Sequence, residues 1–160
     1  MRYLDLFRAL NSHHVRYVLV GGLAMNLHGV PRMTMDIDLL LAMDDANLDR
    51  FIACAKELNL QPVAPVDIAQ LKDPLKRQQW VTEKHMIAFG LQGAVNHLMV
   101  DVLIAPSIDL QHALDNASIR AVGDTQVCLA SIDDMITLKQ HAGRLQDLSD
   151  IEHLERIRGR

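Results

Sequence analysis

The chain has 160 residues, which is the length of one domain with its own hydrophobic core, and 49% of the residues are hydrophobic. Sixteen Lys and Arg against twenty Asp and Glu give a formal net charge of −4, so binding of polyanions over the whole surface is not expected. The longest apolar run, 17–25, is far shorter than the roughly 20 residues that span a bilayer, and no signal-peptide pattern opens the chain. We therefore expect a cytoplasmic protein with no membrane partner.

Cysteine and histidine give no indication of a structural metal. The two cysteines, Cys54 and Cys128, are too few for a disulfide framework or a zinc cluster. Both stand among apolar residues, so we expect small buried hydrophobic side chains. The eight histidines form no H-E-x-x-H motif.

Hydrophobic periodicity and turn residues predict an α+β protein. In the first half of the chain we expect a helix over 3–13, a strand over 15–20, a short helix over 23–28, a strand over 36–43, a helix from 44 or 45 to 58, and extended or turning chain over 61–73. A helix over 74–80 follows, and then two strands over 86–91 and 97–104 around a Gly90–Gly93 turn. The rest is predicted as a helix from 107 or 109 to 116, a strand pair over 119–129 that turns at Gly123-Asp124, a helix over 131–142, and a last helix with the apolar stripe Leu148, Ile151, Leu154 and Ile157.

Helices and strands do not alternate regularly enough for a doubly wound parallel fold, so a mixed sheet is favoured. No repeat or low-complexity linker divides the chain. We expect a single domain over 1–160, with a core over about 1–130 and a helical C-terminal segment over about 131–160.

Two glycines, Gly21 and Gly22, stand between a predicted strand and a short helix. Such a turn lets backbone N–H groups approach a phosphate. The pair also fits an ordinary tight turn, and neither G-x-G-x-x-G nor G-K-[ST] is present. Taken alone, the glycines indicate a phosphate site only weakly.

Three aspartates interrupt hydrophobic strands. Asp36 and Asp38 lie two residues apart on one strand, so their side chains share a face. Adjacent carboxylates repel each other, and a divalent cation held by oxygen ligands relieves the repulsion. Asp101 stands alone in the apolar stretch 98–104, where a carboxylate needs water, a base or a metal. Solvated acids at a strand end or edge would explain the same residues.

The combination of these features resembles the nucleotidyltransferase superfamily, whose fold is that of DNA polymerase β. Gly-Gly, thirteen residues, Asp-Ile-Asp and a later strand with one Asp form the pattern. The resemblance covers most of the chain, is sharpest over 18–41, and returns over 100–104 and 139–154. Small bacterial members, including those of abortive-infection (AbiEii-type) toxin–antitoxin systems, are most similar. The resemblance implies a mixed sheet flanked by helices, with C-terminal helices.

The resemblance also implies an activity and its residues. A Mg-dependent enzyme would move a nucleoside monophosphate from an NTP to an acceptor and release pyrophosphate. Asp36, Asp38 and Asp101 would be the catalytic residues and would hold two magnesium ions, with Asp101 helping to deprotonate the attacking hydroxyl. Gly21 and Gly22 would hold the triphosphate.

Three further residues are candidates for phosphate contacts. Arg32 and Thr34 lie on the loop that leads to the acids, and Lys139 borders the apolar face of its helix. A solvated surface arginine or a snorkelling lysine explains these positions equally well.

The stretch 142–150 carries an Arg/Asp pattern similar to one in the family, which leaves the roles of Arg144, Asp147 and Asp150 open. We favour a helix-to-helix connection in which Asp147 or Ser149 caps the last helix.

Several properties stay open at this point. The acceptor is RNA (including tRNA), a protein side chain or a small molecule, and the chain is a candidate toxin of a toxin–antitoxin pair with a cognate partner protein. A non-catalytic nucleotide-binding or antitoxin-like module is the alternative, and a metal-dependent hydrolase with the same three acids is a further one. We expect no reading of DNA grooves. The NTP and the oligomeric state are not indicated.

Overall fold

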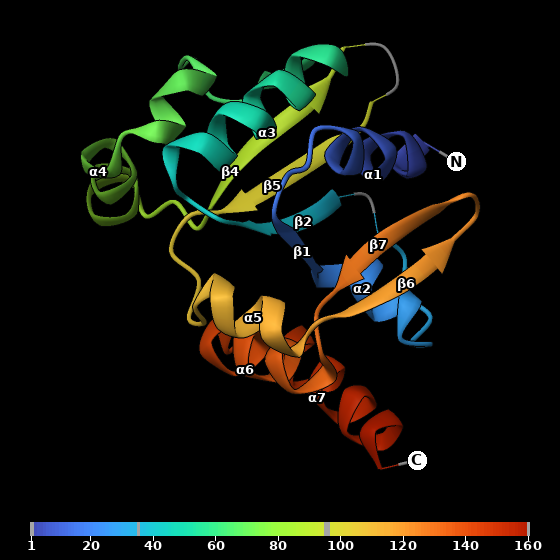
Figure 1. The fold of residues 1–160 in the computed structure, drawn as a ribbon. Coiled ribbons are helices and arrows are strands. Elements are labelled where there is room, and N and C mark those ends of the chain that lie inside the picture. Colours follow the sequence, from blue (N-terminus) through green and yellow to red (C-terminus); the bar gives the residue numbers. More distant parts are fainter. Residues whose placement is uncertain (1, 35, 95–96, 160) are drawn as a thin grey trace.

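The computed structural model describes residues 2–34, 36–94 and 97–159 (Figure 1). Its helices are α1 (Arg2–Ser12), α2 (Gly21–Leu27), α3 (Asp45–Glu57), the 3₁₀ helix η1 (Ile68–Lys72), α4 (Pro74–Lys84), α5 (Leu110–Asn116), α6 (Ile132–Ala142) and α7 (Leu145–Arg158). Its strands are β1 (Tyr17–Val20), β2 (Asp36–Leu41), β3 (Leu60–Pro62), β4 (Ala88–Gly93), β5 (Met99–Leu103), β6 (Ser118–Val122) and β7 (Thr125–Leu129).

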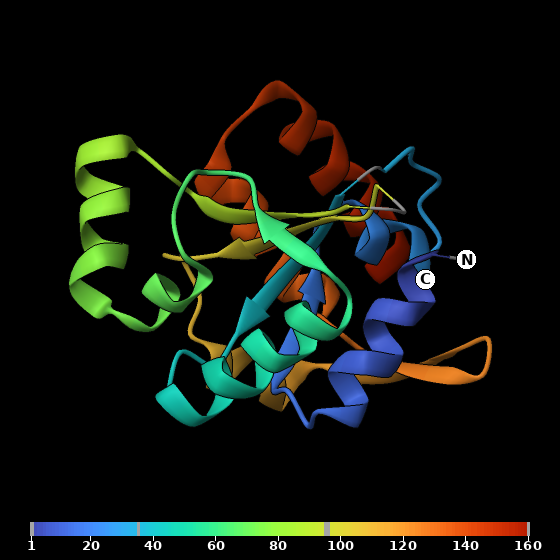
Figure 2. The same ribbon diagram turned by 90° about the horizontal axis from the view of Figure 1, so that it is seen from above.

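The strands of the described ranges form one mixed sheet in the order β3-β4-β5-β2-β1-β7-β6. β2 and β5 are parallel, as are β1 and β7, and the other neighbours are antiparallel. The predicted fold class is therefore confirmed. Seen from above, α4 and the β6–β7 hairpin lie at opposite edges of the molecule (Figure 2).

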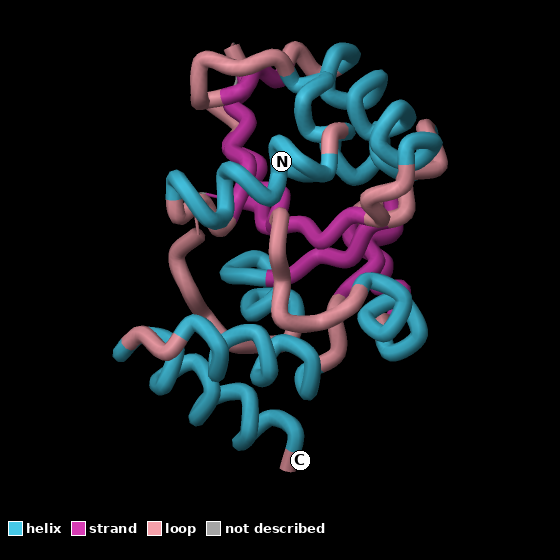
Figure 3. Tube along the Cα trace, turned by 90° about the vertical axis from the view of Figure 1, so that its left-hand side faces the viewer, coloured by secondary structure: helices cyan, strands magenta, loops and turns pink. Residues whose placement is uncertain are grey.

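Helices cover the two sides of this sheet unevenly. α1 and α3 lie on one side, and α5, α6 and α7 gather on the other (Figure 1). The C-terminal helices form a pair below the strands (Figure 3). Among the described residues, no helix is long and apolar enough to cross a membrane.

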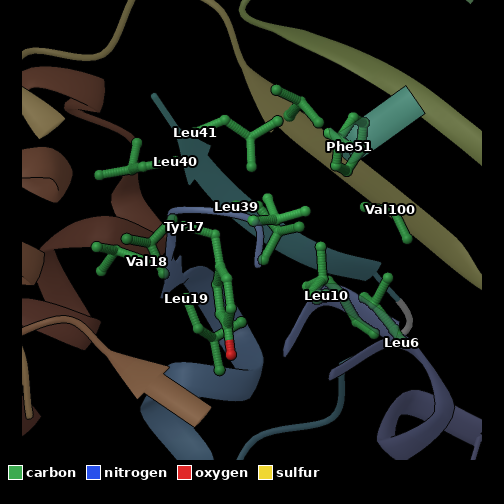
Figure 4. Close-up of a cluster of buried hydrophobic side chains, with 14 of the residues drawn as sticks. Leu6, Leu10, Tyr17, Val18, Leu19, Leu39, Leu40, Leu41, Phe51 and Val100 are labelled. Carbon is green, nitrogen blue, oxygen red and sulfur yellow. The ribbon is translucent and has the colours of Figure 1, made fainter. Parts of the chain in front are cut away.

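The hydrophobic core supports the central strands β1 and β2. Leu6 and Leu10 of α1, Phe51 of α3, Leu39 of β2 and Val100 of β5 are fully buried in one cluster (Figure 4). Burial of large apolar side chains is the main favourable contribution to folding. The central strands therefore hold the side chains that project from them in fixed positions.

The predicted Gly90–Gly93 turn is wrong. Both glycines lie within β4, where Gly90 is paired with Asp101 and Gly93 with Leu60. A glycine in the sequence usually indicates the end of a strand, but glycine also occurs within a strand where a neighbouring group comes close to the backbone. Asp101 provides such an approach, because a Cβ on Gly90 would lie 3.3 Å from Asp101 Oδ1.

Other boundaries differ less. The short helix begins at Gly21 rather than at residue 23, and α4 continues to Lys84 rather than ending at residue 80. The segment 61–73 is not only extended or turning chain, because β3 pairs with β4 at its start and η1 follows. The strand pair that turns at Gly123-Asp124 is confirmed.

The cysteines are both free thiols. Cys54 is buried as predicted, and Cys128 is partly exposed.

Candidate functional site

The register of the sheet gathers the predicted acids on one face. Asp38 of β2 is paired with Asp101 of β5, and the row continues to Val20 of β1 on one side and to Gly90 of β4 on the other. Side chains of paired residues project from the same face, and residues two apart on a strand do so as well. Asp36 therefore shares this face with the other two acids.

The carboxylates repel one another electrostatically. Burial, and then the charges of Asp101 and Asp36, raise the pKa of Asp38 to about 6, against the smaller opposing effect of Lys139 and Arg32. Burial and the charge of Asp36 also raise the pKa of Asp101. A site that disfavours its own negative charges in this way favours a bound cation.

Gly21 brings the backbone directly against Asp38. A Cβ atom on Gly21 would lie 1.9 Å from Asp38 Oδ2, and the backbone there has a φ of +75°, in the left-handed region. A Cβ on Gly22 would lie 2.9 Å from Thr34 Oγ1. The two glycines thus let the start of α2 pack closely against Asp38 of β2 and against Thr34, which precedes β2.

Two of the predicted phosphate-binding residues are cations held by one acid. Lys139 Nζ donates to Asp150 Oδ2 at 2.8 Å, and Arg32 Nη1 donates to the same oxygen. Lys139 is 9% exposed, and its Nζ is also 3.8 Å from Asp147 Oδ1. Neither cation is the freely solvated side chain that the sequence left open.

The predicted apolar stripe of the last helix is confirmed at Ile151, Leu154 and Ile157, which lie in or against the core, and is wrong at Leu148. Leu148 is 58% exposed, whereas Asp147 and Asp150 are buried at 1% and 6% exposure. The signal was present, because Asp147, Asp150 and Leu154 have helical spacing. Acids were not counted as core-facing, since a buried carboxylate is costly unless a cation compensates it.

The favoured cap of α7 is also corrected. Arg144 is the N-cap residue, and Ser149 lies inside the helix. Asp147 takes part as the third helical residue, because its Oδ2 accepts from the Arg144 backbone N at 3.1 Å and from Arg144 Nε at 2.7 Å. Hydrogen bonds from Arg144 hold the pKa of Asp147 below its usual range, against the opposing effect of burial.

One cleft of about 810 Å³ joins the acids, the glycines and the two cations, whereas Asp150 lies outside its lining. The eight predicted site residues all line it, namely Gly21, Gly22, Arg32, Thr34, Asp36, Asp38, Asp101 and Lys139. The volume is in the usual range for small-molecule and cofactor sites. A smaller hollow of about 500 Å³ beside β3 has none of these residues in its lining.

The donor set fits a magnesium–nucleotide complex better than a preformed metal cage. Among the described residues, no three acid, imidazole or thiol groups converge closely enough to hold a metal ion by themselves. Magnesium is commonly held by one or two carboxylates together with substrate phosphates and water. The mutually repelling Asp38 and Asp101 beside a close backbone approach at Gly21 suit that arrangement.

A family comparison matches nearly the whole chain. The model of the family described as "Nucleotidyl transferase AbiEii toxin, Type IV TA system" matches residues 4–159. No curated protein matches the chain.

Solved structures with a similar fold include nucleotidyltransferases. The lincosamide antibiotic adenylyltransferase LnuA with lincomycin bound is similar over 98% of this chain and 94% of its own, with a TM-score of 0.59 and 16% identity. ANT(2'')-Ia in complex with adenylyl-2''-tobramycin is similar over 99% and 93%, with a TM-score of 0.58 and 14% identity. An antigenic nucleotidyltransferase-like protein from Paracoccidioides brasiliensis is similar over 96% and 74%, with a TM-score of 0.59 and 22% identity. At these identities the likeness shows the fold.

Proposed function

The chain belongs to the AbiEii family of nucleotidyl transferases, and from this premise we propose that it transfers a nucleoside monophosphate from a magnesium-bound NTP to an acceptor and releases pyrophosphate. The observation that carries the proposal is the row of paired acids, Asp38 and Asp101, with the backbone of Gly21 directly against Asp38.

The acids have distinct roles in this proposal. Asp36, Asp38 and Asp101 would hold the magnesium ions together with the phosphates of the nucleotide. Magnesium held there would neutralise phosphate charge and stabilise the attacking and leaving oxygens. Asp101 would also accept the proton of the attacking hydroxyl as the general base.

The bonds change as in any in-line phosphoryl substitution. The acceptor oxygen forms a bond to the α-phosphorus while the bond from that phosphorus to the bridging α–β oxygen breaks. Pyrophosphate leaves with the bonding electrons, and the hydroxyl proton moves to Asp101. The residues that hold the substrate in line supply much of the rate by positioning.

The cations of the cleft bind the triphosphate. Lys139 and Arg32 share Asp150 as a counter-ion, so their positive charges are positioned before the nucleotide arrives. Preorganised charges of this kind stabilise developing negative charge without a reorganisation cost. Gly21, Gly22 and Thr34 lie beside them in the same cleft.

The family description also motivates a cellular role. We propose that the chain is the toxin of a toxin–antitoxin pair and acts by modifying its acceptor, which is RNA, a protein or a small molecule. Expression of the wild-type chain should then arrest bacterial growth, and Asp38→Asn should abolish the arrest at equal protein level.

A transfer assay tests the proposed activity. Each of the four NTPs, labelled at the α-phosphorus, is incubated with magnesium, the purified protein, and total RNA, protein extract or a small-molecule pool. We expect label in one acceptor fraction together with pyrophosphate, and neither product with Asp38→Asn. Release of inorganic phosphate would instead indicate the hydrolase, and nucleotide binding without turnover would indicate the non-catalytic module.

A further inference from the structure

The turn between α6 and α7 brings a further cation into the cleft. Gly143 ends α6 in the left-handed region, with a φ of +67°, and its backbone N donates to the Lys139 carbonyl oxygen at 3.0 Å. The chain turns there, and α7, which begins at Leu145, packs against α6. Arg144, the residue at this turn, therefore lines the same cleft as Lys139.

Asp147 holds the side chain of Arg144 in one orientation. Arg144 Nε donates to Asp147 Oδ2 at 2.7 Å, and Arg144 Nη2 donates to Asp147 Oδ1 at 3.2 Å. Asp147 is itself 1% exposed, and the Arg144 backbone N donates to it as well. A guanidinium that binds both oxygens of a buried carboxylate is positioned before a ligand arrives.

Part of this guanidinium is still available to a ligand. Arginine carries more N–H donors than the two bonds to Asp147 use. Among the described residues, Arg144 Nη1 has no hydrogen-bond acceptor, and the side chain is 69% exposed. Asp147 thus fixes one edge of the guanidinium and leaves the end with Nη1 for an anion in the cleft.

Arg144 is the outermost member of a row of charges. Arg32 and Lys139 share Asp150 as a partner. Lys139 also lies 3.8 Å from Asp147, which holds Arg144. Cations and acids therefore alternate along the row, and Arg144 stands at one end of it.

The three cations differ in how strongly they interact with Asp38. Burial and the neighbouring acids raise the pKa of Asp38, and Lys139 and Arg32 are the cations that oppose this rise. Hydrogen bonding and charge from Asp147 raise the pKa of Arg144, and Asp38 adds the smallest contribution. Arg144 is thus close enough to share a ligand with the acids, but it lies further from Asp38 than the other two cations.

We propose that Arg144 binds the terminal phosphate of the nucleotide and makes the site selective for a triphosphate over a diphosphate. In the proposed transfer the α-phosphate lies at the paired acids, so the terminal phosphate lies furthest from them. That phosphate carries more negative charge than the inner two, and its oxygens match the fork of a guanidinium. This inference rests on the proposed nucleotidyl transfer and adds to it the residue that recognises the length of the polyphosphate.

Arg144→Gln should remove this selectivity. Calorimetry in magnesium gives the dissociation constants of each NTP and of the NDP with the same base. The wild type should bind at least one NTP about ten- to a hundredfold more tightly than its NDP, because a hydrogen bond to a charged group contributes on this order. Arg144→Gln should weaken binding of that NTP by about the same factor and change NDP binding by less than about twofold.

Arg156→Gln is the matched control. Arg156 also lies on α7, but it pairs with Glu152 at 2.7 Å on the exposed surface and does not line the cleft. This variant should bind NTP and NDP as the wild type does. Circular dichroism and thermal unfolding check that each variant folds.

Arg144→Lys keeps the test decisive if Arg144→Gln does not fold. Lysine keeps a positive charge next to the buried Asp147, but it lacks the planar fork that matches a phosphate. Its preference for the NTP over the NDP should therefore be lower than that of the wild type. A purely structural role of Arg144 would instead weaken NTP and NDP binding together.

The binding outcomes separate this inference from the proposed function. Equal losses of NTP and NDP affinity in Arg144→Gln, wild-type NTP affinity in that variant, or equal affinity of the wild type for NTP and NDP would overturn the role of Arg144 alone. Wild-type NTP affinity with slower transfer would assign Arg144 to the acceptor instead. If the wild-type protein binds no NTP, the proposed function fails, and this inference fails with it.

Discussion

At the scale of single residues, the negative charge of Asp38 destabilises the folded protein. Its pKa is raised to about 6, so the folded protein binds a proton more tightly than the unfolded chain. Without metal, the contribution of Asp38 to the free energy of unfolding therefore falls as the pH rises from about 4 through about 6. Sites that bind substrate are often destabilised in this way.

Asp38→Asn should stabilise the metal-free protein at neutral pH. The gain in the free energy of unfolding should be on the order of 2 kcal/mol at pH 7.5 and should nearly vanish at pH 4. Thermal unfolding in EDTA at both pH values measures it, and a melting temperature higher by several degrees is expected at pH 7.5. A variant that is less stable than the wild type at pH 7.5 would contradict the electrostatic account.

Gly21 should be intolerant of any side chain. Gly21→Ala places Cβ 1.9 Å from Asp38 Oδ2 and strains a backbone with φ +75°, so it should displace Asp38 and abolish magnesium–NTP binding. Calorimetric titration with NTP measures the loss.

Gly29→Ala separates strain from contact. Gly29 has a φ of +97°, but a Cβ there would have nothing within 4 Å. This variant should lose about 1–2 kcal/mol of stability through strain and still bind NTP. Equal loss of binding in both variants would show that the contact with Asp38 is irrelevant.

At the scale of secondary-structure elements, α7 is attached to the site by charge. Its buried acids contact cations from α6 and from the segment before β2. Removing one partner of a buried ion pair leaves an uncompensated charge, which is costly even where the intact pair contributes little. The loss of Asp150 should therefore weaken the attachment of α7 to the site.

Asp150→Asn tests this dependence. It should lower the free energy of unfolding by about 3 kcal/mol and weaken NTP binding, because Lys139 and Arg32 lose the negative charge that they share. Urea unfolding measures the first effect and calorimetry the second.

Glu152→Gln provides the comparison on the same helix. Glu152 pairs with Arg156 at 2.7 Å on the exposed surface, where an ion pair contributes no more than about 1 kcal/mol. If Asp150→Asn and Glu152→Gln lowered the free energy of unfolding by the same amount, the buried ion pairs would not be what attaches α7.

The local pattern of apolar and turn residues predicted most helices and strands, and contacts between residues far apart in the sequence explain the wrong predictions. The α-helical and strand periods of α1, β1, β2, α3 and α6 are regular, so their positions were predicted to within a few residues. The turn assigned to Gly90–Gly93 failed because the reason for the glycine lies on another strand, at Asp101. The stripe of α7 was wrong only at Leu148. Its two buried acids were missed because cations that lie outside the helix compensate their charges.

At the scale of the whole molecule, the cleft combines distant parts of the chain. The segments 20–38, 87–107 and 135–147 supply its lining. The eight residues predicted from the resemblance to the nucleotidyltransferase superfamily all meet there. The role of Asp150 as the shared partner of Lys139 and Arg32 was not predicted, because it follows only from which elements the fold brings side by side.

The central claim is that this cleft binds a magnesium–nucleotide complex through its paired acids. The most direct measurement is a calorimetric titration of the protein with each NTP, in magnesium and in EDTA, with Asp36→Ala/Asp38→Ala as the control. We predict that at least one NTP binds in magnesium, and that EDTA or the double substitution abolishes this binding. Nucleotide binding that persists in EDTA and in the double variant, or no binding of any NTP, would contradict the account.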